Sequence, residues 1–226
     1  MAATAAAPWD IYREIHKAMR LALFGVTTAA GAADPADDAA VAALVAEWHR
    51  VTFVLDGHHR HEDDFCDVHV QAHAAHLRDE LEAGHRAADA GLAALRAAAG
   101  GLTSAAPPAR AGLLQAFHLD LADFTATYLQ HLRFEESAVM PALNAAMTDD
   151  ELAALTDQIR GSVPPPDMCV FLAYMVPSMN FAERLDMLGG MHQFAPPEIF
   201  EMFRAAAEGA LAPADYRAVA EAAGFA

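Results

Sequence analysis

A histidine and a glutamate lie four residues apart near the end of a long predicted helix, at His131 and Glu135. The helix is expected over residues 113–140, because apolar residues recur there at steps of three and four, as on one face of an α-helix. This face comprises Leu114, Phe117, Leu121, Phe124, Tyr128, His131, Glu135 and Ala138. His131 and Glu135 therefore point into the core together, where an imidazole and a carboxylate need a partner. A metal ion satisfies both groups at once, and the alternative is a pair that hydrogen-bonds to itself.

The same spacing occurs a second time, at His58 and Glu62. Both residues continue the core stripe of another predicted helix, which starts at Asp34-Pro35 with an aspartate cap and a proline in the first turn. The stripe is Val41, Leu44, Val45, Trp48, Val51, Thr52, Leu55, His58, Glu62 and Phe65. Its first part is apolar and its last part has the residue types of a metal site.

Three further histidines follow His58 closely. His61 is expected on the outer face of this helix. His59 and His69 are close enough in angle to act as reserve ligands or to hydrogen-bond around the ligands.

Two other predicted helices each carry one inward histidine. The first runs from a cap at Asp10 to about residue 26, with His16 among Tyr12, Ile15, Met19 and Leu23. The third covers residues 74–99, with His85 among Leu77, Leu81, Ala88, Leu92 and Leu95. A lone core histidine is often satisfied without a metal. Asp89 lies one turn after His85 and either hydrogen-bonds to it or faces solvent. The nearby Arg86 favours the solvent-facing position for Asp89.

The elements that carry these residues are helical throughout. Alanine, leucine, glutamate and methionine dominate the 226 residues, and no strand-like alternation occurs, so the fold class is all-α. Loops are expected at residues 25–34 and 100–108, and Pro141 should kink or end the fourth helix at Met140. The bundle and its metal site are assigned to residues 1–147 and a C-terminal helical extension packed on the bundle to residues 148–226.

The extension is expected to consist of short helices. A capping box at Thr148 and Glu151 begins one that runs to about residue 160. Others follow Pro164-Pro165-Pro166 at residues 167–176, 178–188, 197–208 and 213–223. We expect its methionines to fill the core of the extension. The alternatives are that this layer closes one end of a metal pocket or forms a dimer face. The role of His192 is open.

Charge and cysteine usage exclude several classes of partner. The formal net charge of −17 repels nucleic acid and anionic membrane surfaces, so neither is an expected partner. Cys66 and Cys169 have no CxxC spacing, which favours a reducing cytoplasm. Residues 1–8 lack a basic n-region, and the longest apolar run, residues 168–176, is too short to span a bilayer.

Together, four histidines and two glutamates on four helices supply six nitrogen and oxygen ligands. Six ligands exceed the needs of one tetrahedral ion, and two glutamates facing each other across a bundle suit two bridged cations. A pair of iron ions is the expected cofactor, with manganese or zinc as alternatives because they accept the same ligands.

These residues resemble the hemerythrin-like (HHE cation-binding) family. The resemblance lies in Ile15-His16-Lys17, His58-His59-Arg60-His61-Glu62-Asp63, Glu82-Ala83-Gly84-His85-Arg86 and His131-Leu132-Arg133-Phe134-Glu135-Glu136, in that order. It implies an up-down four-helix bundle with a non-haem di-iron centre and an oxo or hydroxo bridge. It also implies His16 and His58 on one iron, His85 and His131 on the other, and bridging Glu62 and Glu135.

One departure from that family bears on function. Oxygen-carrying members have a second histidine one turn from the one on the third helix, but Leu81 and Asp89 occupy those positions here. This argues against pure reversible O₂ carriage and leaves coordination positions open for O₂, peroxide or NO. Tyr128, one turn before His131, is the candidate catalytic residue. It would either donate a hydrogen bond to a bound oxygen species or ligate the metal directly. The alternative is that Tyr128 is a core aromatic whose hydroxyl is satisfied elsewhere.

The sequence thus predicts an oxidoreductase, either catalase-like or an O₂-activating oxidase with a small organic substrate that enters under the C-terminal extension. The alternatives are a non-catalytic module that binds or senses O₂, NO or iron, and a metal-free structural bundle. A homodimer is compatible with each.

Overall fold

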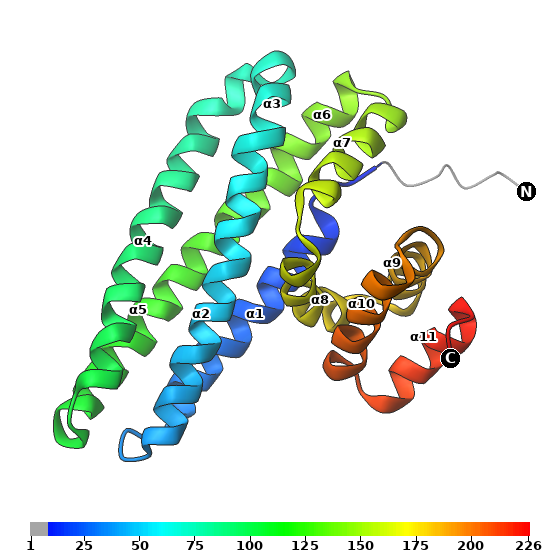
Figure 1. The fold of residues 1–226 in the computed structure, drawn as a ribbon. Coiled ribbons are helices and arrows are strands. Elements are labelled where there is room, and N and C mark those ends of the chain that lie inside the picture. The colour runs from blue at the N-terminus through cyan, green and yellow to red at the C-terminus, as the bar shows by residue number, and fades with distance from the viewer. Residues whose placement is uncertain (1–8) are drawn as a thin grey trace, which may run out of the picture. The chain divides into compact units, whose positions relative to one another are not determined.

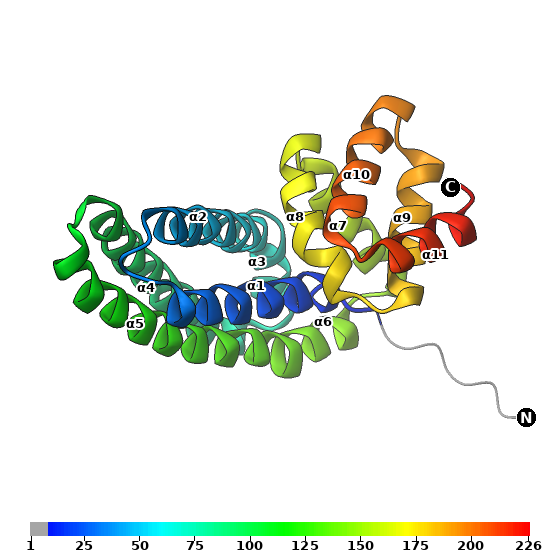
Figure 2. The same cartoon turned by 90° about the horizontal axis from the view of Figure 1, so that it is seen from below.

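The chain forms an all-helical structure in the computed structural model, which describes residues 9–226. No strand occurs among these residues, so the predicted fold class is confirmed. The bundle has four long helices, of which the last three alternate in direction and lie side by side in both ribbon views (Figures 1 and 2). They are α1 (Arg13–Ala32), α2 (Asp38–His61), α4 (Arg78–Ser104) and α5 (Pro107–Phe134). Residues 1–8, where the sequence lacks a basic n-region, lie outside the described part of the chain.

The first connection is shorter than predicted, because α1 continues to Ala32 through most of the expected loop at residues 25–34. Val26 and Ala30 are buried in this stretch, and their packing outweighs the low helix propensity of the glycines and threonines around them. Asp34 caps a turn by accepting a hydrogen bond from the Ala36 amide. The second helix begins only at Asp38, where Asp37 accepts hydrogen bonds from two amides of the first turn.

The connection between α4 and α5 is also shorter than the predicted loop at residues 100–108. Only two residues separate the helices, which end at Ser104 and begin at Pro107. Arg110 is buried beside this turn and donates hydrogen bonds to the carbonyl oxygens of Leu102 and Ala105. The guanidinium therefore satisfies carbonyl groups that the end of a helix leaves without partners.

Two π-helical turns interrupt the bundle helices, and the sequence did not predict them. One is η1 (Glu62–Cys66), between α2 and α3 (Asp67–His73), and the other is η3 (Glu135–Val139), between α5 and α6 (Met140–Ala146). A π turn holds an extra residue and rotates the following face of the helix. Accordingly Cys66 is buried instead of Phe65, and Val139 instead of Ala138.

Pro141 was predicted to kink or end the fourth helix, and it does not end the helical path, because α6 continues beyond it to Ala146. The proline has no amide N–H for the helix ladder, and it follows directly after the π-helical turn at the second residue of α6. The distortion expected from Pro141 is therefore taken up within a continuous path of helix.

Two compact units result, and each has its own contacts. Within the described residues, the first comprises residues 9–13 and 26–161, and includes η2 (Ala75–Leu77) and α7 (Asp149–Ser162) up to Gly161. Trp48 lies fully buried in this unit, with edge-to-face contacts to Phe117 and Phe124. The predicted capping box at the start of α7 is present, since the Thr148 amide donates to Glu151 and the Glu151 amide to Thr148.

The second unit comprises residues 14–25 of α1 and residues 162–226. Its helices are α8 (Pro165–Ser178), α9 (Phe181–Phe194), α10 (Pro197–Ala210) and α11 (Pro213–Ala223). Leu172, Val176, Leu188, Phe203, Ala207, Leu211 and Val219 form its buried core. Lys17 of α1 donates hydrogen bonds to both oxygens of Glu183 at 2.6 and 2.7 Å.

No helix in residues 9–226 combines the length and the apolar character needed to span a membrane.

Candidate metal centre

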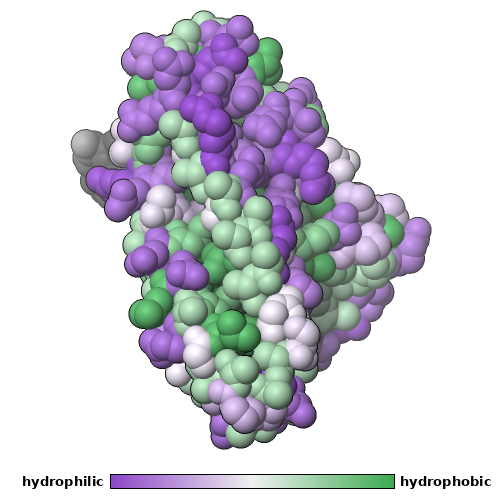
Figure 3. Space-filling view, turned by 90° about the vertical axis from the view of Figure 1, so that its left-hand side faces the viewer, coloured by the Kyte–Doolittle hydropathy of each residue, from purple (hydrophilic) through white to green (hydrophobic). Residues whose placement is uncertain are grey.

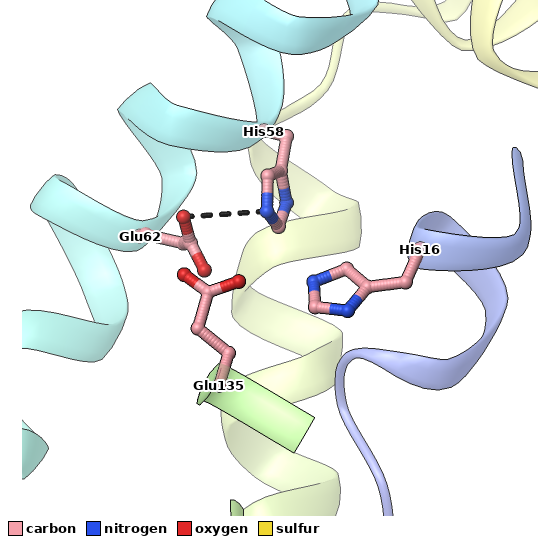
Figure 4. Close-up of side chains that lie close together, drawn as sticks. All are labelled: His16, His58, Glu62 and Glu135. Atoms are coloured by element: carbon pink, nitrogen blue, oxygen red, sulfur yellow. Dashed lines mark ion pairs between the residues drawn. The ribbon is translucent and has the colours of Figure 1, made fainter. Parts of the chain in front are cut away.

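The side chains of His16, His58, Glu62 and Glu135 come together in one group. Each offers one ligand atom, and these atoms lie within 4.8 Å of one another. The close-up shows the four side chains pointing toward a common space from α1, α2, η1 and η3 (Figure 4). His58 Nε2 lies 3.3 Å from Glu62 Oε2.

A second group shares both glutamates with the first. It consists of Glu62, His85, His131 and Glu135, again with ligand atoms within 4.8 Å of one another. His131 Nε2 lies 3.0 Å from Glu135 Oε1, and His85 Nε2 lies 3.5 Å from Glu62 and 3.7 Å from Glu135. The two carboxylates therefore stand between two pairs of imidazoles, one pair on α1 and α2 and the other on α4 and α5.

Two residues of this cluster have buried polar atoms that meet hydrogen-bond geometry with no described residue. Glu62 is 4% exposed, and neither of its carboxylate oxygens meets hydrogen-bond geometry with any described residue. The same holds for Nε2 of His85. Buried polar atoms are rarely left without a hydrogen bond, and a cation between them would satisfy them together. The donors are nitrogen and oxygen only, since no ligand group among residues 9–226 includes a cysteine.

Burial also perturbs the titration of the cluster. Desolvation, and then the neighbouring Glu135 carboxylate, raises the pKa of Glu62 well above its usual range. Desolvation opposes the charged form of His85, but the Glu135 and Glu62 carboxylates outweigh it and raise its pKa from 6.5 to about 10. Burial and the closeness of the two carboxylates therefore favour proton binding by both Glu62 and His85.

The π-helical turns begin at the two glutamates themselves, Glu62 and Glu135. Each glutamate is thus the last residue in register with the histidine one turn before it. The wider turn that follows leaves main-chain groups out of the regular ladder, and such turns are frequent at functional sites. The sequence did not predict that the same π-helical turn occurs at both glutamates. Pro141, which follows the second turn, was the only local signal of a distortion.

Gly84 gives the His131 ring its room. A Cβ atom at Gly84 would lie 2.3 Å from Nδ1 and 2.9 Å from Cε1 of that ring, a separation that real side chains do not adopt. The glycine therefore lets α4 approach α5 closely enough for His85 and His131 to meet Glu135. Their ring centroids are 5.0 Å apart.

Tyr128, the predicted catalytic residue, is buried one turn before His131, with ring centroids 6.0 Å apart. Burial, followed by the charges of Glu62 and Glu135, raises its pKa well above 10, so the phenol keeps its proton. Sequence reasoning placed Tyr12 in the core but gave it no part in the site. The pKa of Tyr12 is raised in the same way, by burial and then by Cys66, Glu62 and Glu135. The sequence feature that could have placed Tyr12 in the site is its position one turn before His16.

The reserve histidines lie in different surroundings. His59 contacts the outer side of the cluster, with its ring 4.0 Å from that of His85. His69 instead stacks on His73, and no ligand group among the described residues includes it. His61 was predicted on the outer face but is half-buried near Phe65.

Asp89 faces solvent as predicted, and its side chain is 66% exposed. Its carboxylate contacts His59, a residue of α2, at 3.1 Å. His192 belongs to the second unit, where its ring lies against Phe200 and Phe225.

A groove between α4 and α5 reaches the cluster from outside. Its volume is about 280 Å³, and Tyr128 and His131 form part of its wall. Small residues of α4 form the opposite wall, including Ala83, Gly84 and Ala87. In the space-filling view of the side on which α4 lies, apolar surface gathers over the middle and one end (Figure 3). A small uncharged molecule could reach Tyr128 by this route.

Fold and site together define a class of protein, a helical bundle with a buried histidine and glutamate cluster suited to cations. The family model described as the hemerythrin HHE cation binding domain matches residues 7–143. The chain therefore belongs to the hemerythrin HHE cation-binding domain family, as its motifs predicted. Neither the curated proteins nor the solved structures contain a match to this chain.

Proposed function

We propose that this protein holds two iron ions and acts as an oxidoreductase on O₂ or peroxide. The observation that carries the proposal is the sharing of Glu62 and Glu135 by two ligand groups. A carboxylate has two oxygens and can bridge two cations, so both glutamates would serve as ligands shared by the two ions. His16 and His58 would complete the ligands of one ion, and His85 and His131 those of the other.

The paired iron ions would supply the redox equivalents, as they do in non-haem di-iron proteins. The chain's own residues would bind and orient the small molecule and manage its protons. The protonated Tyr128 can donate a hydrogen bond from the wall of the groove, while the mainly apolar lining disfavours charged substrates. Six protein ligands for two ions leave coordination positions open for the reactant.

Metal analysis tests the centre, and peroxide turnover tests the reaction. We expect two iron atoms per chain with near-ultraviolet bands of an oxo bridge, and both should be lost in Glu62→Ala and Glu135→Ala. Tyr128→Phe should keep its iron and lose roughly a hundredfold or more in turnover, in the range of a positioned proton donor. Tyr174→Phe is the matched control, because Tyr174 is a buried tyrosine of the second unit. Iron-loaded protein without turnover of O₂ or peroxide would instead favour a binding or sensing module.

A further inference from the structure

A second set of cation ligands lies on the outer side of His85. His59 of α2, Asp63 of η1 and His85 of α4 each offer one ligand atom, and these atoms lie within 4.8 Å of one another. Asp63 Oδ1 is 3.9 Å from His59 Nε2 and 3.4 Å from His85 Nδ1. Such separations suit two ligands of one ion, since each would bond to it at about 2.0–2.2 Å.

Two of these ligands, His59 and Asp63, reach solvent, whereas His85 is buried and is shared with the proposed centre. The side chain of Asp63 is 55% exposed and that of His59 is 14% exposed. Asp89 Oδ1 lies 3.1 Å from Nδ1 of His59. A carboxylate at Nδ1 favours the tautomer with its proton there, which leaves the lone pair on Nε2, the nitrogen nearer Asp63. His59 is thus oriented as a ligand by a residue of the neighbouring helix.

His85 faces both sets of ligands with different nitrogens. Its Nε2 lies near Glu62 and Glu135, and its Nδ1 lies near Asp63. A neutral imidazole has one lone pair, so His85 can ligate an ion on only one side at a time. When Nε2 binds an inner ion, Nδ1 carries the proton and can donate it to Asp63.

We propose that His59, Asp63 and His85 form a loading site, which takes a divalent cation from solvent and passes it to the inner centre through His85. The formal net charge of −17 raises the local concentration of cations around such a site. The loading role rests on the proposed di-metal centre, whereas cation binding by the outer ligands does not.

The outer site is tested with Co²⁺ alone in a chain whose inner site is disabled. The double variant Glu62→Gln/Glu135→Gln should bind one Co²⁺ per chain. Adding His59→Gln should weaken this binding by roughly tenfold or more. Asp89→Asn, at an exposed position, should weaken it in the same direction. His61→Gln is the matched control, because it removes a neighbouring half-buried histidine outside the ligand set. A double variant that binds no Co²⁺, or binds it equally well without His59, overturns the outer site.

The loading role is tested in the otherwise unchanged chain by the rate of Co²⁺ uptake. His59→Gln should slow uptake by roughly tenfold and leave the final count at two ions. An unchanged rate, or a lower final count, would overturn the loading role. Failure of the proposed centre has a different signature, namely a full-length chain that binds Co²⁺ only when His59 is present.

Discussion

Replacing Gly84 with alanine would put a methyl group into the space of the His131 ring. The new Cβ would lie 2.3 Å from Nδ1, 2.9 Å from Cε1 and 3.1 Å from Cγ of that ring. Non-bonded carbon atoms prefer about 3.5–4.0 Å, so the ring must retreat by roughly 1 Å or the two helices must separate. Metal ligands tolerate displacements of only about 0.2 Å, and we therefore expect roughly 10- to 100-fold weaker metal binding.

Gly91→Ala provides the matched control. Its Cβ would lie 2.5 Å from Cδ2 of Phe124, so it overlaps a ring of α5 from the same helix, α4, but away from the ligands. Each alanine gains about 1 kcal/mol in helix propensity. Each also pays for overpacking by about 1–3 kcal/mol, so both variants should lose similar, small amounts of folding stability.

The assay has two readouts. Urea unfolding in the presence of a chelator gives the stability of each metal-free variant, and a competition titration with Co²⁺ gives its metal affinity. Gly84→Ala should lose affinity while Gly91→Ala keeps it. Equal losses of affinity in the two variants would refute the reasoning, because they would trace metal binding to general helix packing and not to the His131 ring.

Four other predictions follow from the site and its surroundings. Removing the metal with a chelator should lower the free energy of unfolding by urea. When the free metal concentration is one hundredfold above Kd, the expected loss is about 2.7 kcal/mol for each bound ion. In the metal-free protein, the raised pKa of His85 stabilises the fold fully below pH 6.5, and this contribution is lost as the pH rises toward about 10. The free energy of unfolding measured with urea should therefore fall by roughly 3 kcal/mol between about pH 6.5 and 9, and His85→Gln should remove most of this pH dependence. Because His85 must lose its proton to ligate, Co²⁺ binding near neutral pH should release about one proton from this group, which calorimetry in two buffers of different ionisation enthalpy would measure. Arg110→Leu should cost about 2–4 kcal/mol by leaving the carbonyl oxygens of Leu102 and Ala105 without their donor, with no change in metal content by elemental analysis.

Local spacing carried much of the prediction, because an α-helix places residues four apart on one face whatever surrounds it. The pairs His58–Glu62 and His131–Glu135 could therefore be assigned to the core from the sequence, and both glutamates are indeed buried. The match of residues 7–143 to the HHE family agrees with the order of those motifs. The use of the six residues as ligands remains a prediction.

Several features depended on packing that no local pattern reports. The loop predicted at residues 25–34 is mostly helix, since burial of Val26 and Ala30 overrides weak local propensity. The contact between Asp89 and His59 joins α4 to α2, two helices whose mutual rotation the sequence leaves open.

The amino-acid sequence by itself determined that the protein is helical and that the pairs His58–Glu62 and His131–Glu135 turn inward, because both follow from residue type and a period of 3.6. Only the tertiary structure decided that the inward side chains form two groups sharing Glu62 and Glu135, and that a π-helical turn begins at each glutamate. Distances between helices depend on how their surfaces interlock, at Gly84 and His131 above all, and a linear spacing does not specify that fit.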